Sequence, residues 1–419
     1  MNYKNQYIWN TLGTLASTAL SLILLVIVSR LTAPYDADLF SISFTLSQQF
    51  LVIGLFGIRS YQSTDVLEEH HFEHYFYSRL ITVSFMILTL VTYLGVSHFS
   101  IEKNVIITFM TLYRVCDAFS DLFQGDFQQK NRSDLSGKIL FYRSLFSVLI
   151  FFIILITVNS LLIATVVMFL LNFVMIFALD IRYFFQNTSV SLTSKSQFPR
   201  FNFAEVKIIL VNCFPLFING FLITYIFNEP RLVIDKLLEN GQLIEGMQRD
   251  FNILFMPTFV LNILILILRP MFTQLSLYRR NLEMASFFKL VKKVCAGLLI
   301  FIVLVLLLGD LIGIPVLSLV FNVSLSRYKL AFLILLLAGA FNLFSALIDN
   351  LMVIYRNQKY MIIVNVLTFL VSKLITLPLI SKYQLLGASY SFLITMIVFF
   401  VLSATLVWVL NREFHKTSD

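Results

Sequence analysis

Charged residues are scarce in this chain of 419 residues: Asp, Glu, Lys and Arg make up 13% of it, whereas 58% of the residues are hydrophobic. Soluble proteins carry roughly 25% charged residues, so this chain has too few to cover a surface that faces water. Apolar runs of about 20 residues, long enough to cross a bilayer, recur along the whole sequence. The scarcity of charge therefore predicts an all-α, polytopic membrane protein.

Cysteine is rare as well, with only Cys116, Cys213 and Cys295, each inside an apolar stretch. Their spacing offers no disulfide framework and no metal motif, so we interpret them as small buried side chains. The sequence also has no glycine-rich phosphate loop, no acidic metal-binding cluster and no large polar domain. We therefore expect a protein that is not an enzyme and that needs neither a cofactor nor a metal.

The net charge of +8 does not indicate nucleic-acid binding, because the basic residues lie mainly in short loops between apolar runs. Basic loops mark the cytoplasmic side of a membrane protein. With twelve spans, these loops share one side with both termini, which predicts cytoplasmic N- and C-termini in a plasma membrane. The first apolar run has no small-residue cleavage site at its end, so we expect it to remain as a span.

Twelve spans are expected at 8–31, 38–60, 79–97, 103–128, 139–158, 160–186, 204–228, 251–275, 286–309, 328–353, 360–381 and 385–411. A polar stretch at 191–203 is interpreted as a cytoplasmic linker. It separates an N-terminal lobe at 1–190 from a C-terminal lobe at 204–419, with six spans in each.

The two predicted lobes resemble each other. The fourth span ends in Gln-Lys-Asn-Arg at 129–132, and the tenth ends in Tyr-Arg-Asn-Gln at 355–358, at the same place within each lobe. Acidic or amide groups precede both endings. A match between the fourth and tenth spans predicts a parallel repeat about an axis along the membrane normal, as found in some transporters.

Charges inside spans are costly at bilayer depth and usually face protein or water. In the fourth span, Arg114, Asp117 and Asp121 are spaced so that they share one helix face. Two interpretations remain open. Either Arg114 pairs with Asp117 to hold helices together, or this face lines a hydrated path or couples to an ion.

The seventh and eighth spans contain prolines, Pro215 and Pro257, which interrupt helical hydrogen bonding. Broken helices in a membrane usually line a cavity, where water or polar groups satisfy the freed backbone. These two spans are therefore candidate walls of a transport pathway. Their candidate polar residues are Asn212, Asn219, Asp235, Lys236 and Asn262.

Four arginines lie at the ends of spans or close to them, namely Arg30, Arg59, Arg231 and Arg269. Each could be an interfacial anchor. Together they would form a cationic cavity if the two lobes face each other, and the planar guanidinium binds phosphate oxygens in pairs. The alternative to a cationic cavity is that an acid such as Asp38 or Asp349 binds a cation whose movement is coupled to transport.

The sequence from Glu68 to His74 holds the main cluster of histidines. His70 and His74 have the i, i+4 spacing that places two imidazoles on one helix face, as in a metal site. We favour the other interpretation, a solvated amphipathic segment on the membrane surface.

Three stretches of this sequence resemble polysaccharide and lipid II flippases of the multidrug/oligosaccharidyl-lipid/polysaccharide exporter superfamily. The first is Val-Ser-Arg-Leu at 28–31 followed by Asp-Leu-Phe at 38–40. The other two are 228–236 and 255–262, the latter with Arg-Pro downstream at 269–270. Thr32 and Ala33 stand where a glycine is common in that superfamily. The resemblance extends over the whole chain in span number and lobe division.

The resemblance implies a V-shaped transporter with a central cavity between two six-helix lobes. It further implies a substrate, an oligosaccharide carried on a polyprenyl pyrophosphate and moved from the inner to the outer leaflet of a bacterial plasma membrane. Partner glycosyltransferases and a polysaccharide polymerase are implied in the same way. On this interpretation Arg30, Arg59 and Arg231 would bind the pyrophosphate.

Two other function classes compete with this one. A multidrug cation antiporter would favour acids and aromatic residues in its cavity over several arginines. A membrane polysaccharide polymerase usually carries a sizeable outer loop, whereas the longest one expected here, at about 229–250, is short.

Overall fold

The computed structural model describes residues 3–65, 69–187, 201–281, 283–355 and 358–416, with side chains left out at 3–4, 187, 259–260, 262–267, 269–270, 273, 358 and 410–416. All regular secondary structure in these ranges is helical. The predicted all-α architecture of a polytopic membrane protein is therefore confirmed.

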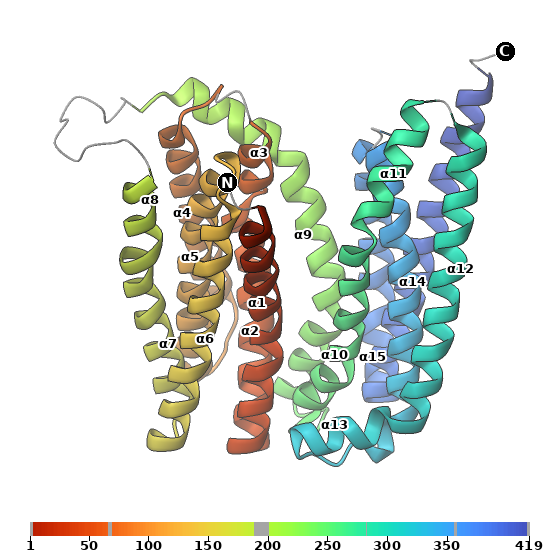
Figure 1. Cartoon of the computed structure of the whole chain (residues 1–419). Coiled ribbons are helices and arrows are strands. Elements are labelled where there is room, and N and C mark those ends of the chain that lie inside the picture. Colours follow the sequence, from red (N-terminus) through yellow and green to blue (C-terminus); the bar gives the residue numbers. More distant parts are fainter. Residues whose placement is uncertain (1–2, 66–68, 188–200, 282, 356–357, 417–419) are drawn as a thin grey trace. The chain divides into compact units, whose positions relative to one another are not determined.

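The chain divides into two compact units, Met1–Thr224 and Tyr225–Asp419. The first contains α1 (Tyr3–Leu31), α2 (Pro34–Leu55), α3 (Ile58–Thr64), α4 (Phe72–Val96), α5 (Ile101–Gln129), α6 (Ser133–Val158), α7 (Leu161–Met175), the π-helix η1 (Ile176–Ile181), α8 (Arg182–Asn187) and the first part of α9 (Phe203–Glu239) (Figure 1).

The second unit contains the rest of α9, α10 (Met247–Ile267), α11 (Arg269–Arg280), α12 (Met284–Leu308), the π-helix η2 (Gly309–Gly313), α13 (Ile314–Phe321), the 3-10 turn η3 (Ser326–Tyr328), α14 (Lys329–Ile354), the 3-10 turn η4 (Gln358–Tyr360) and α15 (Met361–Lys416). The division between the units falls inside α9. Most of the predicted linker lies outside the described residues, so the predicted lobe limits stay a prediction.

Nine helices in the described residues are long and apolar enough to cross a membrane by length and composition. α5, the predicted fourth span, is not among them and carries charged residues along its length. α10, the predicted eighth span, has side chains that are described only in part. α15 contains both the eleventh and the twelfth predicted spans, joined at Gln384, where φ is 52°. Every predicted span therefore falls mainly within helix.

Two predicted spans are interrupted in the structure. The range 38–60 breaks after Leu55, because Phe56 and Gly57 adopt left-handed φ angles of 50° and 73° before α3 begins. A side chain at 57 would be strained by its backbone and would also press on Leu216, 2.8 Å from an added Cβ. The range 251–275 is divided at Leu268, between α10 and α11, where φ is −79° and the backbone stays right-handed.

Large apolar side chains cover the outer faces of several helices. On α4, Leu88 and Val91 are each 62% exposed, and on α12 Ile300 is 71% exposed. A soluble protein rarely leaves extended apolar surface uncovered, whereas hydrocarbon accepts it. These faces are therefore the lipid-facing sides expected of membrane helices.

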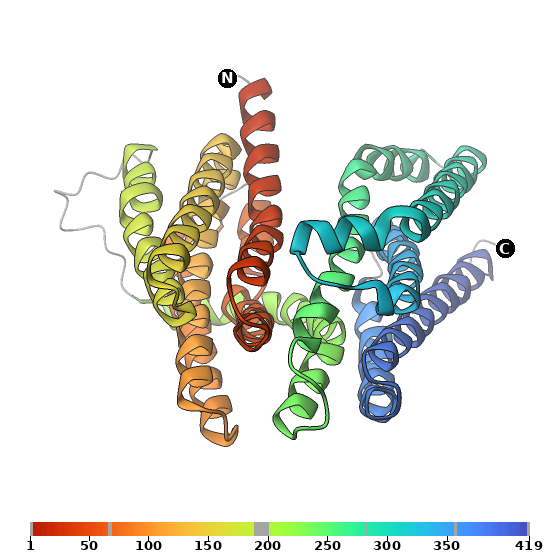
Figure 2. The same cartoon turned by 90° about the horizontal axis from the view of Figure 1, so that it is seen from below.

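α5 is the central helix of the first unit, in contact with α2, α3, α4, α6 and α7 (Figure 2). α14 holds the corresponding place in the second unit, where it contacts α10, α11, α12 and α15. In the predicted numbering these are the fourth and tenth spans, the pair from which the repeat was inferred. The pairing of α2 with α5 and of α10 with α14 gives this predicted repeat a structural counterpart.

α1 packs along α6 with no room for side chains at their closest point. A Cβ added to Gly137 of α6 would overlap backbone atoms of Trp9 and Asn10 in α1, and one added to Gly13 would overlap the backbone of Gly137. Small residues allow such close approach in membranes, where van der Waals contact replaces the hydrophobic effect between helices.

We expect Gly137→Ala to destabilise the protein by about 1–3 kcal/mol, because the added methyl group must separate two helix backbones. Gly297→Ala in α12 is the matched control, because an added Cβ there meets nothing within 4 Å, and alanine favours helix. Thermal unfolding in lipid nanodiscs would measure both. Equal melting temperatures for the two variants would contradict the close contact of α1 with α6.

Candidate functional site

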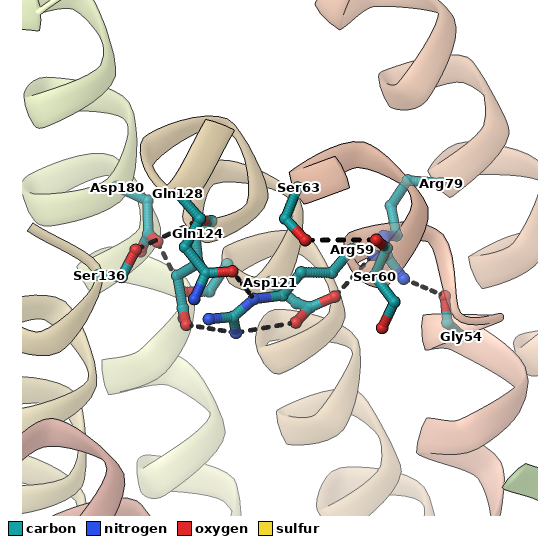
Figure 3. A network of polar contacts seen from close by, with 11 residues as sticks. Gly54, Arg59, Ser60, Ser63, Arg79, Asp121, Gln124, Gln128, Ser136 and Asp180 are labelled. Atoms are coloured by element: carbon teal, nitrogen blue, oxygen red, sulfur yellow. Dashed lines mark hydrogen bonds and ion pairs between the residues drawn. The ribbon is translucent and has the colours of Figure 1, made fainter. Parts of the chain in front are cut away.

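The carboxylate of Asp121 on α5 binds two arginines that come from different helices (Figure 3). Its Oδ2 accepts from Nη2 of Arg79 on α4 at 2.8 Å, and its Oδ1 accepts from Nη1 of Arg59 on α3 at 3.2 Å. Arg79 is completely buried, whereas the side chain of Arg59 is 26% exposed. One acid thus joins a buried cation to a cation that solvent can reach.

Arg59 reaches Asp121 because the chain breaks at Phe56 and Gly57. The break turns α3 against α5, where Arg59 also donates to Gln128 Oε1 at 3.1 Å and to Gln124 Oε1 at 2.8 Å. Arg59 is therefore held by one charge and two amides on a single face of α5.

The same break frees a carbonyl at the end of α2. Gly54 O lies in the last turn, where helical carbonyls lack partners, and it accepts from Arg79 Nη1 and from Thr82 Oγ1 at 2.9 Å. Arg79 therefore links the end of α2 to Asp121, which fixes α2, α4 and α5 relative to one another.

One helical turn earlier, Asp117 repeats this arrangement. Its Oδ2 accepts from Arg114 of α5 at 2.8 Å, and its Oδ1 accepts from Arg143 of α6 at 2.9 Å. Arg143 also donates to Asn172 of α7 at 3.3 Å, and Arg114 lies over the ring of Phe44 at 4.7 Å. Both oxygens of each acid are therefore engaged by arginine.

A third acid, Asp180 in the π-helix η1, is bound differently. It is fully buried, and its Oδ1 accepts from Ser120 Oγ at 2.6 Å. Ser120 in turn accepts from the amide of Gln124 at 3.0 Å, which connects Asp180 to the network around Arg59 (Figure 3). Among the described residues, Asp180 Oδ2 has no hydrogen-bond partner. π-Helical turns often mark functional positions.

In the second unit, Arg231 of α9 is 4% exposed. It donates to Asn252 of α10, to the carbonyl of Phe227 at 3.0 Å and to Asn228 at 3.2 Å, and it lies over the Phe255 ring at 4.2 Å. The guanidinium is thus packed between polar groups and aromatic rings.

A separate ion pair lies nearby in sequence on α9. Glu229 is 2% exposed and is bound by Lys373 of α15 at 3.2 Å, and Lys373 also contacts the hydroxyl of Tyr225. This pair ties α9 to α15 within the second unit.

The remaining predicted site residues are placed as follows. Arg30 and Lys236 are exposed, Asp38 and Asp235 are each 8% exposed, Asn219 and Asp349 are partly exposed, and Asn212 is exposed and donates to Tyr61 Oη at 3.0 Å. The side chains of Asn262 and Arg269 lie outside the described residues. Pro215 and Pro257 lie inside α9 and α10, so neither ends its helix.

Sequence reasoning placed Arg114, Asp117 and Asp121 together but missed Arg79, Arg143 and Asp180 as site residues. Each of the three lies inside a helix that is apolar enough to span the membrane. An isolated charge in such a helix needs a partner at membrane depth. The presence of a charge inside an apolar span is therefore the sequence signal that could have identified these three residues. It does not identify their partners.

No known protein-family model and no curated protein matches this sequence. Solved structures do. An inward-facing multidrug resistance MATE family transporter of the MOP superfamily is 12% identical with a TM-score of 0.69, covering 94% of this chain and 96% of that one. The lipid II flippase MurJ in an inward closed conformation is 14% identical with a TM-score of 0.70, covering 96% of this chain and 87% of that one.

A third structure, a MOP superfamily transporter from Pyrococcus furiosus described as having a binding pocket of reverse polarity, is 12% identical with a TM-score of 0.53, covering 97% of this chain and 95% of that one. Identities this low show the fold alone. The chain therefore has the fold of MOP superfamily transporters. The location in a bacterial plasma membrane and the cytoplasmic termini stay predictions.

We expect Arg79→Met to lower the free energy of unfolding by about 3–5 kcal/mol, because a buried ion pair loses one partner and Gly54 O loses a donor. Arg182→Met is the matched control, because Arg182 is exposed at the start of α8. Reversible unfolding in mixed micelles would measure both. Equal stabilities would show that the ion pairs around α5 do not hold the bundle together.

Proposed function

We propose that this protein is a transporter that moves a polyprenyl-pyrophosphate-linked oligosaccharide, an anionic lipid-linked precursor, from the inner to the outer leaflet. The observation that carries the proposal is the balance of charge around α5. Arg59, Arg79, Arg114 and Arg143 surround two acids whose four oxygens are all engaged by arginine. With Asp180 included, the network still has one more arginine than aspartate, which favours an anionic ligand over a cationic one.

Arg59 is the residue that we propose to bind the pyrophosphate in the first unit. Its side chain is the most exposed of the four arginines. If Arg59 turns away from α5, Asp121 still holds Arg79 at 2.8 Å and stays paired. The release of Arg59 therefore leaves no acid unpaired, and its guanidinium can bind two phosphate oxygens at once.

Gln124 and Gln128 suit the same interpretation. They hold Arg59 through neutral amides, whose hydrogen bonds are weaker than those to a charged acceptor. A phosphate can therefore replace them. Amide groups left free near the headgroup can in turn bond to sugar hydroxyls, so this patch provides groups for both parts of the substrate.

Transport would follow alternating access, in which the site opens first to one side of the membrane and then to the other. The oligosaccharide headgroup would cross inside the protein while the polyprenyl chain stays in lipid. A membrane potential that is negative inside favours the outward movement of anionic charge by about 2.3 kcal/mol per charge per 100 mV. Partner glycosyltransferases and a polymerase belong to the same proposal.

The direct test uses purified protein in liposomes with a polyprenyl-pyrophosphate oligosaccharide that carries a fluorophore on its sugar. A membrane-impermeant quencher reports how fast the label changes leaflet. We expect movement with the protein and none in empty liposomes. The absence of movement with folded protein would contradict the proposed substrate.

In the same assay we expect Arg59→Gln to slow movement about tenfold or more, since a hydrogen bond to a charged group contributes about 1.5–3 kcal/mol. Arg59→Lys should restore part of the rate by keeping the charge, and Arg182→Gln should leave it unchanged. If Arg59→Gln flips the substrate as fast as the unaltered protein, Arg59 does not bind the pyrophosphate.

A cation antiporter is the second candidate function, and one observation favours it. Asp180 is a fully buried acid with an oxygen that has no hydrogen-bond partner among the described residues, and such an acid can exchange a proton or a metal cation. On this alternative, Asp180→Asn would abolish proton-driven uptake of ethidium into everted vesicles. The flippase proposal expects no ethidium uptake above that of vesicles without the protein.

A further inference from the structure

Three side chains that could bind a metal ion meet at one end of the first unit. His70 lies just before α4, His74 lies in the first turn of α4, and Glu205 lies in the first turn of α9. One ligand atom from each lies within 4.8 Å of the others. None of the three takes part in the ion pairs around α5, so a site here is independent of the proposed transport function.

The two ring nitrogens of His70 contact groups from two different helices. Its Nδ1 lies 2.8 Å from Glu205 Oε2, and its Nε2 lies 3.4 Å from Tyr61 Oη. Tyr61 Oη also accepts from Asn212 at 3.0 Å. If His70 carries its proton on Nε2 and donates it to Tyr61, the Nδ1 lone pair points toward Glu205. A histidine that ligates through one nitrogen usually donates from the other in this way.

The loop that carries His70 is held in place by Asp65. Its Oδ1 accepts from the Glu69 backbone N–H at 2.9 Å, and its Oδ2 accepts from the His70 N–H at 3.1 Å and from the Tyr75 hydroxyl at 2.9 Å. These bonds hold the backbone at Glu69 and His70 and connect it to the side chain of Tyr75 on α4. Together with the contacts of its ring to Tyr61 and Glu205, they position His70 before any ion binds, which is what a selective site requires.

His74 supplies a second, independent observation. Its Nδ1 is buried and has no hydrogen-bond partner among the described residues. A buried polar atom without a partner is unfavourable, and such atoms in a folded protein call for an explanation. An ion bound by the cluster would provide this explanation. It would give His74 a partner and would explain why a second imidazole lies beside the pair of His70 and Glu205.

We propose that His70, His74 and Glu205 bind a divalent transition-metal cation, with Zn²⁺ as the expected ion. Two imidazoles and one carboxylate are ligands that zinc prefers, whereas magnesium and calcium prefer oxygen alone. The ligands would close to about 2.0–2.2 Å from the ion, with a water in the fourth position. The ion would fasten the start of α9 to the start of α4.

The test uses full-length protein purified with a streptavidin-binding tag, because a polyhistidine tag would itself bind zinc. After equilibration with Zn²⁺ and removal of free ion, the bound metal is measured by mass spectrometry. We expect about one zinc per chain. We expect none for His74→Ala and Glu205→Gln. His71→Ala is the control, because His71 is exposed in the same segment and outside the cluster.

Three further measurements separate a lost ligand from a lost fold. Tyr61→Phe keeps all three ligands and removes only the group that orients His70, so we expect its affinity for Zn²⁺ to fall about 10- to 100-fold. In the unaltered protein, Zn²⁺ should raise the melting temperature relative to a chelator. Co²⁺ at the site should give the visible absorption of tetrahedral coordination.

The proposal fails if the unaltered protein retains no zinc and its melting temperature is the same with Zn²⁺ and with chelator. It also fails if His71→Ala loses as much zinc as His74→Ala, because the binding would then belong to histidines in general. Either result would leave His70 and Glu205 as a hydrogen-bonded pair that needs no ion.

Discussion

The first unit depends on how two acids are neutralised inside an apolar bundle. Asp117 and Asp121 lie one turn apart on α5 with side chains that are 24% and 16% exposed, and a carboxylate largely removed from water needs a cation beside it. Arg79 and Arg143 bring those cations from the helices on either side of α5. The central position of α5 agrees with this requirement, because a helix that carries two largely enclosed acids must be surrounded by the helices that carry their partners. The left-handed turn at Gly57 serves the same end, since it lets α3 fold back onto α5.

The fold alone does not decide what a protein of this architecture binds. Structures described as a multidrug transporter and as a lipid II flippase both resemble this chain over nearly its whole length. A shared scaffold can carry opposite charges in its site, and the side chains decide what it binds. Here arginine occupies the oxygens of both Asp117 and Asp121, and only Asp180 keeps an oxygen without a partner among the described residues of this network. The proposal of an anionic substrate rests on that difference in side chains.

The short helix α3 connects the two polar clusters of the first unit. Arg59 extends from it to Asp121 and the glutamines of α5, while Tyr61, two residues later, contacts His70. An ion bound at His70, His74 and Glu205 would therefore hold the helix that also carries the most exposed arginine. α3 therefore connects the segment of His70 to the network around Asp121, through seven residues of which the predicted span 38–60 included only the first three.

The sequence by itself determined that the chain is a series of membrane helices, because a bilayer accepts long apolar runs and excludes charge, and both can be read from composition. The spacing of Arg114, Asp117 and Asp121 likewise determined that they share one face, since residues three and four apart are neighbours on a helix. Only the tertiary structure decided the partners. Arg79 and Asp121 are 42 residues apart, and His70 and Glu205 are 135 residues apart. Local periodicity relates only residues a few positions apart, so it cannot predict pairs this far apart in the sequence. Burying a charge or an imidazole without a partner is unfavourable, and only the folded chain brings the partner beside it.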